Sequence, residues 1–309
     1  MTYWLYRAIA RLPLWMCYPI ATAAAWLAQY VLRYRRQIIL NNLVGAFPEH
    51  SHAWRKQRLS EFYSGLADTT IEIIFGSRMS LEEISARVHY ENPEVVRIAT
   101  DNFTRPAIVL TLHQGNWEWM LHGAKAALNI RVDPVYKKLR SPGADRFALE
   151  TRSQFGAKPI LMKHVARNVL KHRAEARLIA LVADQSPGKR ERVHWTTFLN
   201  QSTAFFSGGA AIARATGLPV IFATCQRVSR GYYNVRFEVI TGTPKELPED
   251  EIIERYTQLA EREIRRHPAS WLWSNNRWKR SKPLPATQLA AATPAIAGSD
   301  KSNQENPSP

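Results

Sequence analysis

A histidine and a glutamate separated by four residues stand in the segment 113–118, which reads HQGNWE. On one continuous helix His113 and Glu118 would point roughly 140° apart, because a helix turns ~100° per residue. Gly115 allows a tight turn between them, and Asn116 can cap a helix that carries Glu118 in its first turn. The carboxylate can then hold one imidazole nitrogen as N–H while the other accepts a proton, so the pair predicts a general base. A strand-end histidine beside an ordinary surface glutamate is the alternative.

A second polar group follows another apolar run. Asp184 and Gln185 come directly after the apolar residues 178–183. Ligands of open α/β sheets gather beyond the carboxyl ends of the strands, so we expect these two side chains at the same edge as His113. An aspartate that only caps a loop is the alternative interpretation.

The surrounding segments alternate between strand-like and helical patterns. Strands are expected at 107–112, 132–136, 159–162, 178–183, 219–225 and 233–240, and helices at 38–76 with a break at 47–49, 117–128, 145–155, 165–174, 205–216 and 249–266. This alternation is typical of an α/β fold with a mixed, largely parallel sheet flanked by helices. We expect residues 1–36 to anchor the chain, 37–282 to form the main domain and 283–309 to be a disordered tail.

The N-terminal segment 12–32 carries no charged residue, and arginines flank it on both sides. Its length corresponds to roughly 30 Å of helix, the thickness of a hydrocarbon core, and we expect a membrane-anchoring helix. Its tryptophan, tyrosine, proline and glutamine residues leave two alternatives open, an amphipathic helix lying in the interface and a cleaved signal peptide. The arginines at 33, 35 and 36 argue against export, because they favour keeping this end in the cytoplasm beside anionic headgroups.

The charge of the chain is strongly positive, with a formal value of +16 at pH 7. Such a balance implies an anionic partner, which can be nucleic acid, an acidic membrane surface or a phosphorylated substrate. The two cysteines, Cys17 and Cys225, lie far apart in sequence and indicate no disulfide framework. The histidines show no ligand spacing, so no metal site is expected.

Taken together, these motifs resemble the lipid A biosynthesis acyltransferase family, the late acyltransferases of the lauroyl and myristoyl type. This family lies within the broader lysophospholipid and glycerolipid acyltransferase group. The similarity covers nearly everything before the tail and rests on the order and spacing of several segments. These are the N-terminal anchor, 35–49, 113–118, 152–156, 184–185, 198–205 and 271–279.

The resemblance implies an O-acyltransferase domain at 37–282 that moves a fatty acyl chain from a thioester to a hydroxyl of a lipid A precursor. It makes His113 the general base, and Glu118 the group that orients the ring and offsets its developing charge. Substrate contacts are expected from Asn116, Lys137, Arg152, Asp184 and Gln185. Asn116 is also a candidate donor to the oxyanion.

The resemblance also implies the partners of the reaction. No cofactor is expected beyond the co-substrate, which is acyl carrier protein or coenzyme A carrying the acyl thioester. The expected partners are acyl carrier protein, a membrane lipid acceptor and an anionic membrane surface, and not nucleic acid. The expected location is the bacterial inner membrane, with the catalytic domain on the cytoplasmic side.

Two other functions stay open. The first keeps the same chemistry but acylates a lysophospholipid, a glycolipid or another lipid hydroxyl. The second is a basic, non-catalytic protein that binds membranes or nucleic acid. Only the net charge and the scattered aromatic residues support this alternative.

Overall fold

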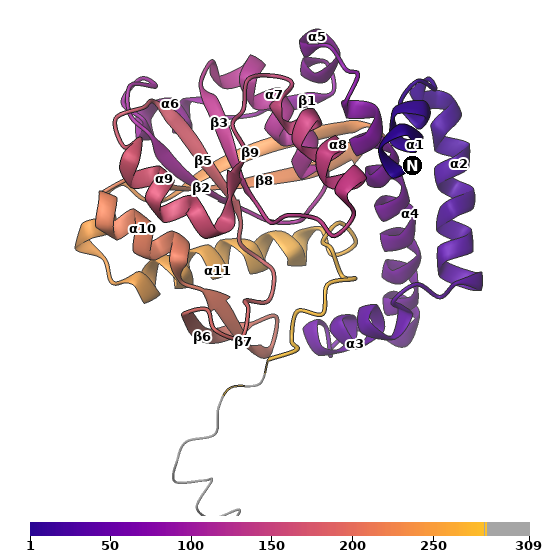
Figure 1. Ribbon diagram of the computed structural model, residues 1–309. Helices are drawn as coiled ribbons and strands as arrows, with labels where there is room; N and C mark the ends of the chain where they lie inside the picture. The colour runs from indigo at the N-terminus through magenta and orange to yellow at the C-terminus, as the bar shows by residue number, and fades with distance from the viewer. Residues whose placement is uncertain (281, 283–309) are drawn as a thin grey trace, which may run out of the picture.

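A twisted central sheet with helices on both faces makes up most of the molecule (Figure 1). The structure is a computed structural model that describes residues 1–280 and 282, so the tail expected at 283–309 lies outside the described residues. Within those residues, seven strands form this sheet in the order β1-β9-β8-β2-β5-β3-β4. Neighbouring strands are parallel except for β8 and β9, which are antiparallel. The prediction of a mixed, largely parallel sheet is confirmed.

The elements follow the predicted alternation closely in the central part of the chain. The sheet contains β1 (Val88–Tyr90), β2 (Ala107–Thr111), β3 (Arg131–Tyr136), β4 (Ile160–Leu161), β5 (Arg177–Val182), β8 (Val220–Ser229) and β9 (Tyr232–Thr241), and a separate hairpin contains β6 (Val193–Phe198) and β7 (Gln201–Phe206). The helices are α1 (Thr2–Ile9), α2 (Leu14–Trp26), α3 (Arg36–Ala46), α4 (His52–Gly76), α5 (Leu81–Ser85), α6 (Glu94–Ala99), α7 (Trp117–Leu128), α8 (Pro142–Ser153), α9 (Val165–Lys171), α10 (Gly208–Thr216) and α11 (Glu249–Arg266), with the π-helix η1 (Leu27–Val31) and the short 3₁₀ turns η2 (Met162–His164) and η3 (Pro244–Glu246).

Successive residues of each strand point to opposite faces of the sheet, and this alternation divides the core in two. On β2, Ile108 and Leu110 pack in one cluster with residues of α9, α10 and α11. Val109 points the other way, into a cluster with residues of α5, α6 and α7. The long helix α4 contributes to both, with Phe62 in the first cluster and Phe75 packed against the second. Helix α4 therefore runs past the end of the sheet and joins its two faces.

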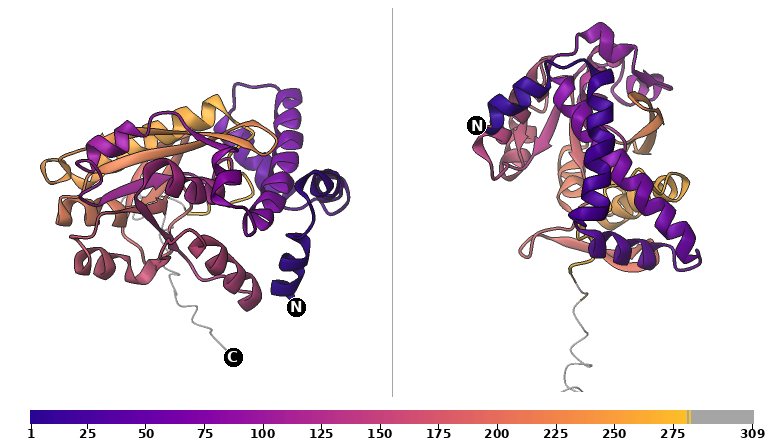
Figure 2. Two further views of the ribbon diagram at one scale, coloured as in Figure 1. Left: turned by 90° about the horizontal axis from the view of Figure 1, so that it is seen from above. Right: turned by 90° about the vertical axis from the view of Figure 1, so that its right-hand side faces the viewer.

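The N-terminal segment forms α1, α2 and η1, and α2 lies along α4 (Figure 2). Tyr18 of α2 donates a hydrogen bond to Glu72 of α4 over 3.1 Å, and Tyr6 of α1 packs edge-on against Phe147 of α8. The helical conformation is interrupted between α1 and α2, and Pro13 directly precedes the first residue of α2. In the part of the chain that the structure describes, no helix combines the length and the apolar character needed to cross a membrane. The expected spanning helix is therefore not supported.

The hairpin β6–β7 corrects the prediction that a helix begins at residue 205. Strand β7 continues to Phe206, and α10 begins only at Gly208. The hairpin turns at Leu199 and Asn200, which have φ of 50° and 64°. Two-residue hairpin turns with positive φ normally use Asn-Gly or Asp-Gly. The Leu-Asn sequence of this turn lacks that signal, so the sequence did not predict the hairpin.

Candidate active site

The turn after β2 has the predicted strand–turn–helix geometry. Gly115 adopts a φ of 58°, and a Cβ atom there would lie 2.1 Å from the carbonyl oxygen of Cys225. Only glycine fits this position, because both the backbone conformation and the close approach of β8 exclude a side chain. The side chain of Asn116 accepts a hydrogen bond from the backbone N–H of Trp119 over 3.0 Å and caps α7. The turn places His113 at the end of β2 and Glu118 in the first turn of α7.

The carboxylate beside the histidine ring belongs to Asp184. Strands β2 and β5 are parallel neighbours, and their last residues, Thr111 and Val182, pair with each other. His113 and Asp184 each follow two positions later and therefore lie opposite each other. Nδ1 of His113 lies 2.7 Å from Oδ1 of Asp184, and the backbone N–H of His113 donates to Oδ2 over 3.0 Å. The prediction that Asp184 and His113 share one edge of the sheet is confirmed.

Asp184 is held in its ionised form. Its side chain is 2% exposed, and burial by itself would raise the pKa of its carboxyl group. The adjacent His113 and the hydrogen bonds from His113 and Trp271 outweigh burial and leave this pKa below its ordinary value. Because an ionised carboxylate only accepts hydrogen bonds, Nδ1 of His113 carries the proton and Nε2 presents its lone pair. Nε2 lies 3.2 Å from the side-chain nitrogen of Gln185, a neighbour predicted from the sequence.

Glu118 is paired with Arg152 rather than with His113. The guanidinium Nε of Arg152 lies 2.9 Å and 3.2 Å from the two carboxylate oxygens of Glu118, and its Nη2 also donates to this carboxylate. Burial opposes ionisation of Glu118, yet the hydrogen bonds and charge of Arg152 bring the pKa of this carboxyl below its usual value. The predicted contact between Glu118 and the imidazole of His113 is not formed, because Glu118 points from α7 toward Arg152 on α8. Asp184 contacts the imidazole instead.

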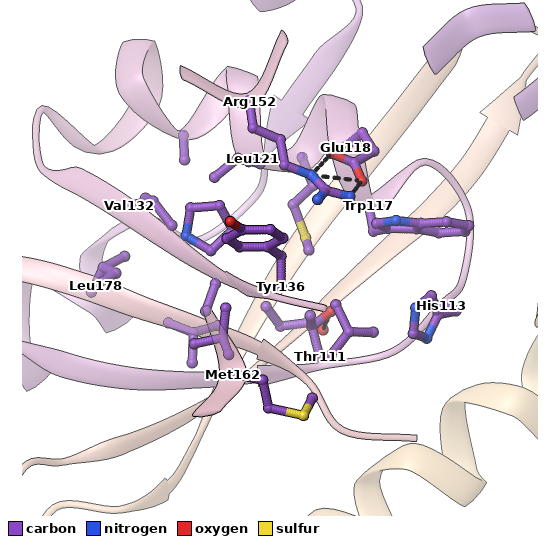
Figure 3. Close-up of a pocket in the computed structure, with 18 of the residues that line it drawn as sticks. Thr111, His113, Trp117, Glu118, Leu121, Val132, Tyr136, Arg152, Met162 and Leu178 are labelled. Carbon is purple, nitrogen blue, oxygen red and sulfur yellow. Dashed lines mark hydrogen bonds and ion pairs between the residues drawn. The ribbon is translucent and has the colours of Figure 1, made fainter. Parts of the chain in front are cut away.

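A cavity of about 370 Å³ opens beside these residues, between α7 and the sheet (Figure 3). Polar side chains line one part of it, among them His113, Glu118, Lys137, Arg152 and Gln185. Apolar side chains from α7 and from several strands of the sheet line the rest, among them Val109, Met120, Leu121, Ala124, Leu128, Val132, Leu178 and Phe237. The arrangement joins a polar reaction centre to an apolar pocket suited to a hydrocarbon chain.

Comparison with known proteins now identifies the family. A family model described as bacterial lipid A biosynthesis acyltransferase matches residues 1–280, which include all elements of the site. The chain belongs to this family. It is therefore an acyltransferase, as the resemblance to this family implied. No curated protein matches the chain.

Two further residues named from the sequence occupy different positions in the acyltransferase. Lys137 is exposed at the end of β3 and lines the cavity, where it can meet an anionic group. Asn116 is fully buried and does not line the cavity, because its amide nitrogen donates to Glu72 over 3.1 Å and its oxygen caps α7. The expected substrate contact of Asn116 is thus corrected to a structural role.

The C-terminal segment of the acyltransferase supplies a residue that sequence reasoning did not place. Nε1 of Trp271 donates to Oδ2 of Asp184 over 2.6 Å, so this aspartate is held from both sides. Trp271 reaches the site because Gln114 and Trp271 form an isolated β-bridge. Arg277 is buried nearby, where burial lowers its pKa to about 10 although Asp184 opposes this shift. The only available signal was the aromatic and basic character of 271–279, which marks the family but assigns no partner.

Proposed function

We propose that this acyltransferase moves a fatty acyl chain from an acyl thioester, carried by acyl carrier protein, to a hydroxyl of a lipid A precursor, with His113 as the general base. One observation carries the proposal. The ring of His113 is fixed through Nδ1 by an ionised, buried Asp184, and it lines an apolar cavity large enough for part of a hydrocarbon chain.

The reaction follows from this geometry. The acceptor hydroxyl oxygen attacks the carbonyl carbon of the thioester while Nε2 of His113 takes the hydroxyl proton. The resulting imidazolium is stabilised by Asp184 over the 2.7 Å contact. When the tetrahedral intermediate collapses, the C–S bond breaks and the proton on Nε2 passes to the departing sulfur. The products are an ester and a free thiol, and no covalent enzyme intermediate is required.

The apolar part of the cavity takes the transferred chain. Side chains of Val109, Leu128 and Phe237 belong to its lining, and the polar groups belong to the part that contains His113. Each methylene group buried there contributes ~0.8 kcal/mol to binding. The depth of the apolar part therefore sets the preferred length of the acyl chain.

Basic side chains at the cavity serve the acyl carrier protein. Lys137, Lys138 and Arg140 are exposed after β3, and Lys137 and Lys138 also line the cavity. None of the three has a carboxylate partner within 4.0 Å among the described residues, so their charge is available to an acidic protein. The charge of Arg152 is instead offset by Glu118.

Exposed apolar side chains on α1, α2 and η1 support association with a membrane surface. The N-terminal apolar surface consists of Trp4, Leu5, Trp15, Met16, Ile20, Trp26, Leu27, Tyr30, Val31 and Leu32. Exposed arginines at 7, 11, 33 and 35 stand between or just after these residues in the sequence. Tryptophan and leucine beside basic residues are typical of segments that lie in the interface of an anionic bilayer. We propose that this surface holds the enzyme to the cytoplasmic side of the bacterial inner membrane.

An acyl-transfer assay tests the proposal. Purified protein is incubated with acyl carrier protein bearing a labelled acyl thioester and with a lipid extract that contains lipid A precursors. We expect label in the lipid A fraction, identified by mass spectrometry. Label in another lipid would move the acceptor to a different class, and absence of transfer to any lipid would overturn the proposal.

Substitutions at the base sharpen this assay. We predict that His113→Ala and Asp184→Asn each lower kcat at least ~10²-fold, because the first removes the base and the second removes the anion that fixes its tautomer. His89→Ala is the matched control, since His89 is exposed on β1 and outside the cavity. A near-normal kcat in either variant would exclude this catalytic pair.

A further inference from the structure

A second cavity, of about 190 Å³, shares a wall with the main one. His113 and Trp117 are the two residues common to both linings. The main cavity is bounded by α7 and the sheet, whereas the smaller cavity is bounded by one face of α4 and by residues 269–272. The Trp117 ring stands edge-on to the His113 ring, with 5.1 Å between their centroids. The catalytic ring therefore stands between two separate spaces.

The interior of the smaller cavity is mainly apolar. Its apolar side chains are those of Phe62, Leu66, Trp117, Ala269, Trp271 and Leu272. Two charged side chains also line it, and each already has a partner. Arg227 donates to Asp68 over 2.6 Å, and Glu61 lies 2.9 Å from Arg58. An occupant is consequently expected to present hydrocarbon rather than charge.

The smaller cavity also lies close to the N-terminal apolar surface. Tyr63, one residue beyond the cavity residue Phe62 on α4, donates to the carbonyl oxygen of Tyr34 over 2.6 Å. Ala25 of α2 packs in the same core cluster as Leu59 and Phe62. The middle of α4, which lines the cavity, belongs to the same helix that contacts α2 and η1, the elements that bear the exposed Trp26 and Tyr30. Hydrocarbon held at that surface would therefore lie beside the helix that lines the cavity.

We propose that the smaller cavity is the acceptor subsite, and that it takes the hydrocarbon of a lipid next to the hydroxyl that is acylated. The inference rests on the proposed function, in which the main cavity holds the donor chain. Two hydrocarbon chains then approach His113 from opposite sides, and the acceptor hydroxyl reaches Nε2 between them.

Gly65 offers a direct way to fill the acceptor subsite. It lies on the cavity face of α4, and a Cβ atom built there would meet only the guanidinium of Arg227, at 3.8 Å. A larger side chain at this position therefore extends into free space. Leucine also favours a helix more than glycine does, so the substitution does not weaken α4.

The test measures the Michaelis constants of both substrates for Gly65→Ala and Gly65→Leu. We expect KM for the lipid acceptor to rise slightly in the first variant and at least ~10-fold in the second, with KM for the acyl thioester within about twofold of the wild-type value. Gly242→Leu is the matched control, because a Cβ at Gly242 meets nothing within 4 Å and Gly242 lines neither cavity. Ala124→Leu, in the main cavity, is expected to give the opposite pattern.

Each outcome separates the inference from the function on which it rests. An inactive wild-type enzyme overturns the proposed function. An active wild-type enzyme with an unchanged acceptor KM in Gly65→Leu, or with a raised thioester KM alone, overturns only the acceptor subsite.

A second measurement does not depend on folding of the variant. A hydroxyacyl lipid with a diazirine beside its hydroxyl is photocrosslinked to the wild-type enzyme, and the labelled peptides are mapped. Label on residues 61–69 is expected, and label confined to α7 and β5 would overturn the inference.

Discussion

At the scale of single residues, Asp184 is the centre of the site. Its two oxygens accept from Nδ1 and the backbone N–H of His113 and from Nε1 of Trp271. These donors stabilise the anion although the side chain is almost completely buried. Asp184 therefore stays charged at neutral pH and keeps the lone pair of His113 on Nε2. The carboxylate that orients the His113 ring, our proposed base, thus comes from the end of a different strand and not from the motif 113–118.

The choice between Glu118 and Asp184 shows what the sequence can predict about the site. Both carboxylates follow apolar runs or turns, and both were named as site residues from their positions. Which one reaches Nδ1 depends on β5 lying next to β2, with β3 displaced to the far side of β5. Strand order is a property of long-range packing, and local spacing does not contain it.

His122 is a buried histidine that the mechanism does not use. Its side chain is 1% exposed, and neither ring nitrogen has a hydrogen-bond partner of good geometry. Burial is the main cause that lowers its pKa to about 4, although Glu118 opposes the shift. Protonation of His122 therefore favours the unfolded chain.

We predict an acid-sensitive stability that depends on His122. Its contribution is complete above the unfolded pKa of about 6.5 and is lost progressively as the pH falls toward about 4, by about 3 kcal/mol in total. Chemical unfolding of His122→Leu between pH 7 and pH 4 should show a smaller loss than the wild type, with equal or higher stability at pH 7. His89→Leu, at an exposed position, should keep the wild-type dependence. If the free energy of unfolding of His122→Leu fell between pH 7 and pH 4 as steeply as that of the wild type, His122 would not be the cause of the acid sensitivity.

At the scale of elements, the ion pair between Glu118 and Arg152 connects α7 with α8. The side chains are 9% and 20% exposed, so each charge is poorly solvated without the other. Helix α8 in turn packs against α1 through Phe147. The first turn of α7 is consequently held by its cap at Asn116 on one side and by α8 on the other.

We predict that stability and turnover respond differently when this pair is removed. Glu118→Gln should lower the free energy of unfolding by about 3 kcal/mol, because it leaves Arg152 without its counter-ion. Glu118→Gln with Arg152→Met should recover most of this loss, measured by chemical unfolding. Turnover should stay below the wild-type value in both, since Glu118 lines the cavity beside His113 and its loss removes a negative charge there. If turnover recovered in the double variant, Glu118 would act only as the counter-ion of Arg152 and not in the reaction.

The sequence predicted most elements of the central sheet but missed those with weak local signals. Helix α7 was predicted at 117–128 and α11 at 249–266, both confirmed, because each has strong apolar periodicity and charged ends. Strand β1 has three residues and the turn after β6 lacks glycine, so neither has a clear pattern. Short strands depend on pairing partners distant in sequence, here β9 for β1.

At the scale of the whole molecule, the N-terminal apolar surface, the smaller cavity and the main cavity are connected through α4 and His113. The N-terminal apolar surface contacts α4, α4 lines the smaller cavity, and His113 lines both cavities. The cations after β3 belong to the main cavity. In the reaction that we propose, the lipid acceptor and the acidic carrier protein thus approach the same histidine from different sides.

We predict that membrane binding depends on the N-terminal apolar surface. Replacing Trp15, Trp26 and Val31, which are 74%, 59% and 56% exposed, with serine should lower the partition coefficient on anionic vesicles at least ~10-fold. Stability should change little, because these side chains are not part of the core. The measurement is co-sedimentation with vesicles, accompanied by thermal unfolding.

A matched triple variant completes this experiment. Ile98, Leu170 and Val228 are 69%, 53% and 61% exposed and lie outside the N-terminal surface. Their replacement with serine should leave vesicle binding unchanged. Equal losses in both triple variants would show that apolar exposure in general, and not this surface, holds the protein to the bilayer.

The hydrogen bond from Trp271 to Asp184 has a consequence for the timing of synthesis. The two residues are 87 positions apart, and the ribosome adds about 5–20 residues per second, so Trp271 is made roughly 4–17 s after Asp184. During this interval His113 and Asp184 already exist, but the aspartate lacks its indole donor and the β-bridge of Gln114 is absent. The hydrogen bonds of Asp184 are therefore complete only after Trp271 has been added to the nascent chain, long after the amino-terminal helices have been made.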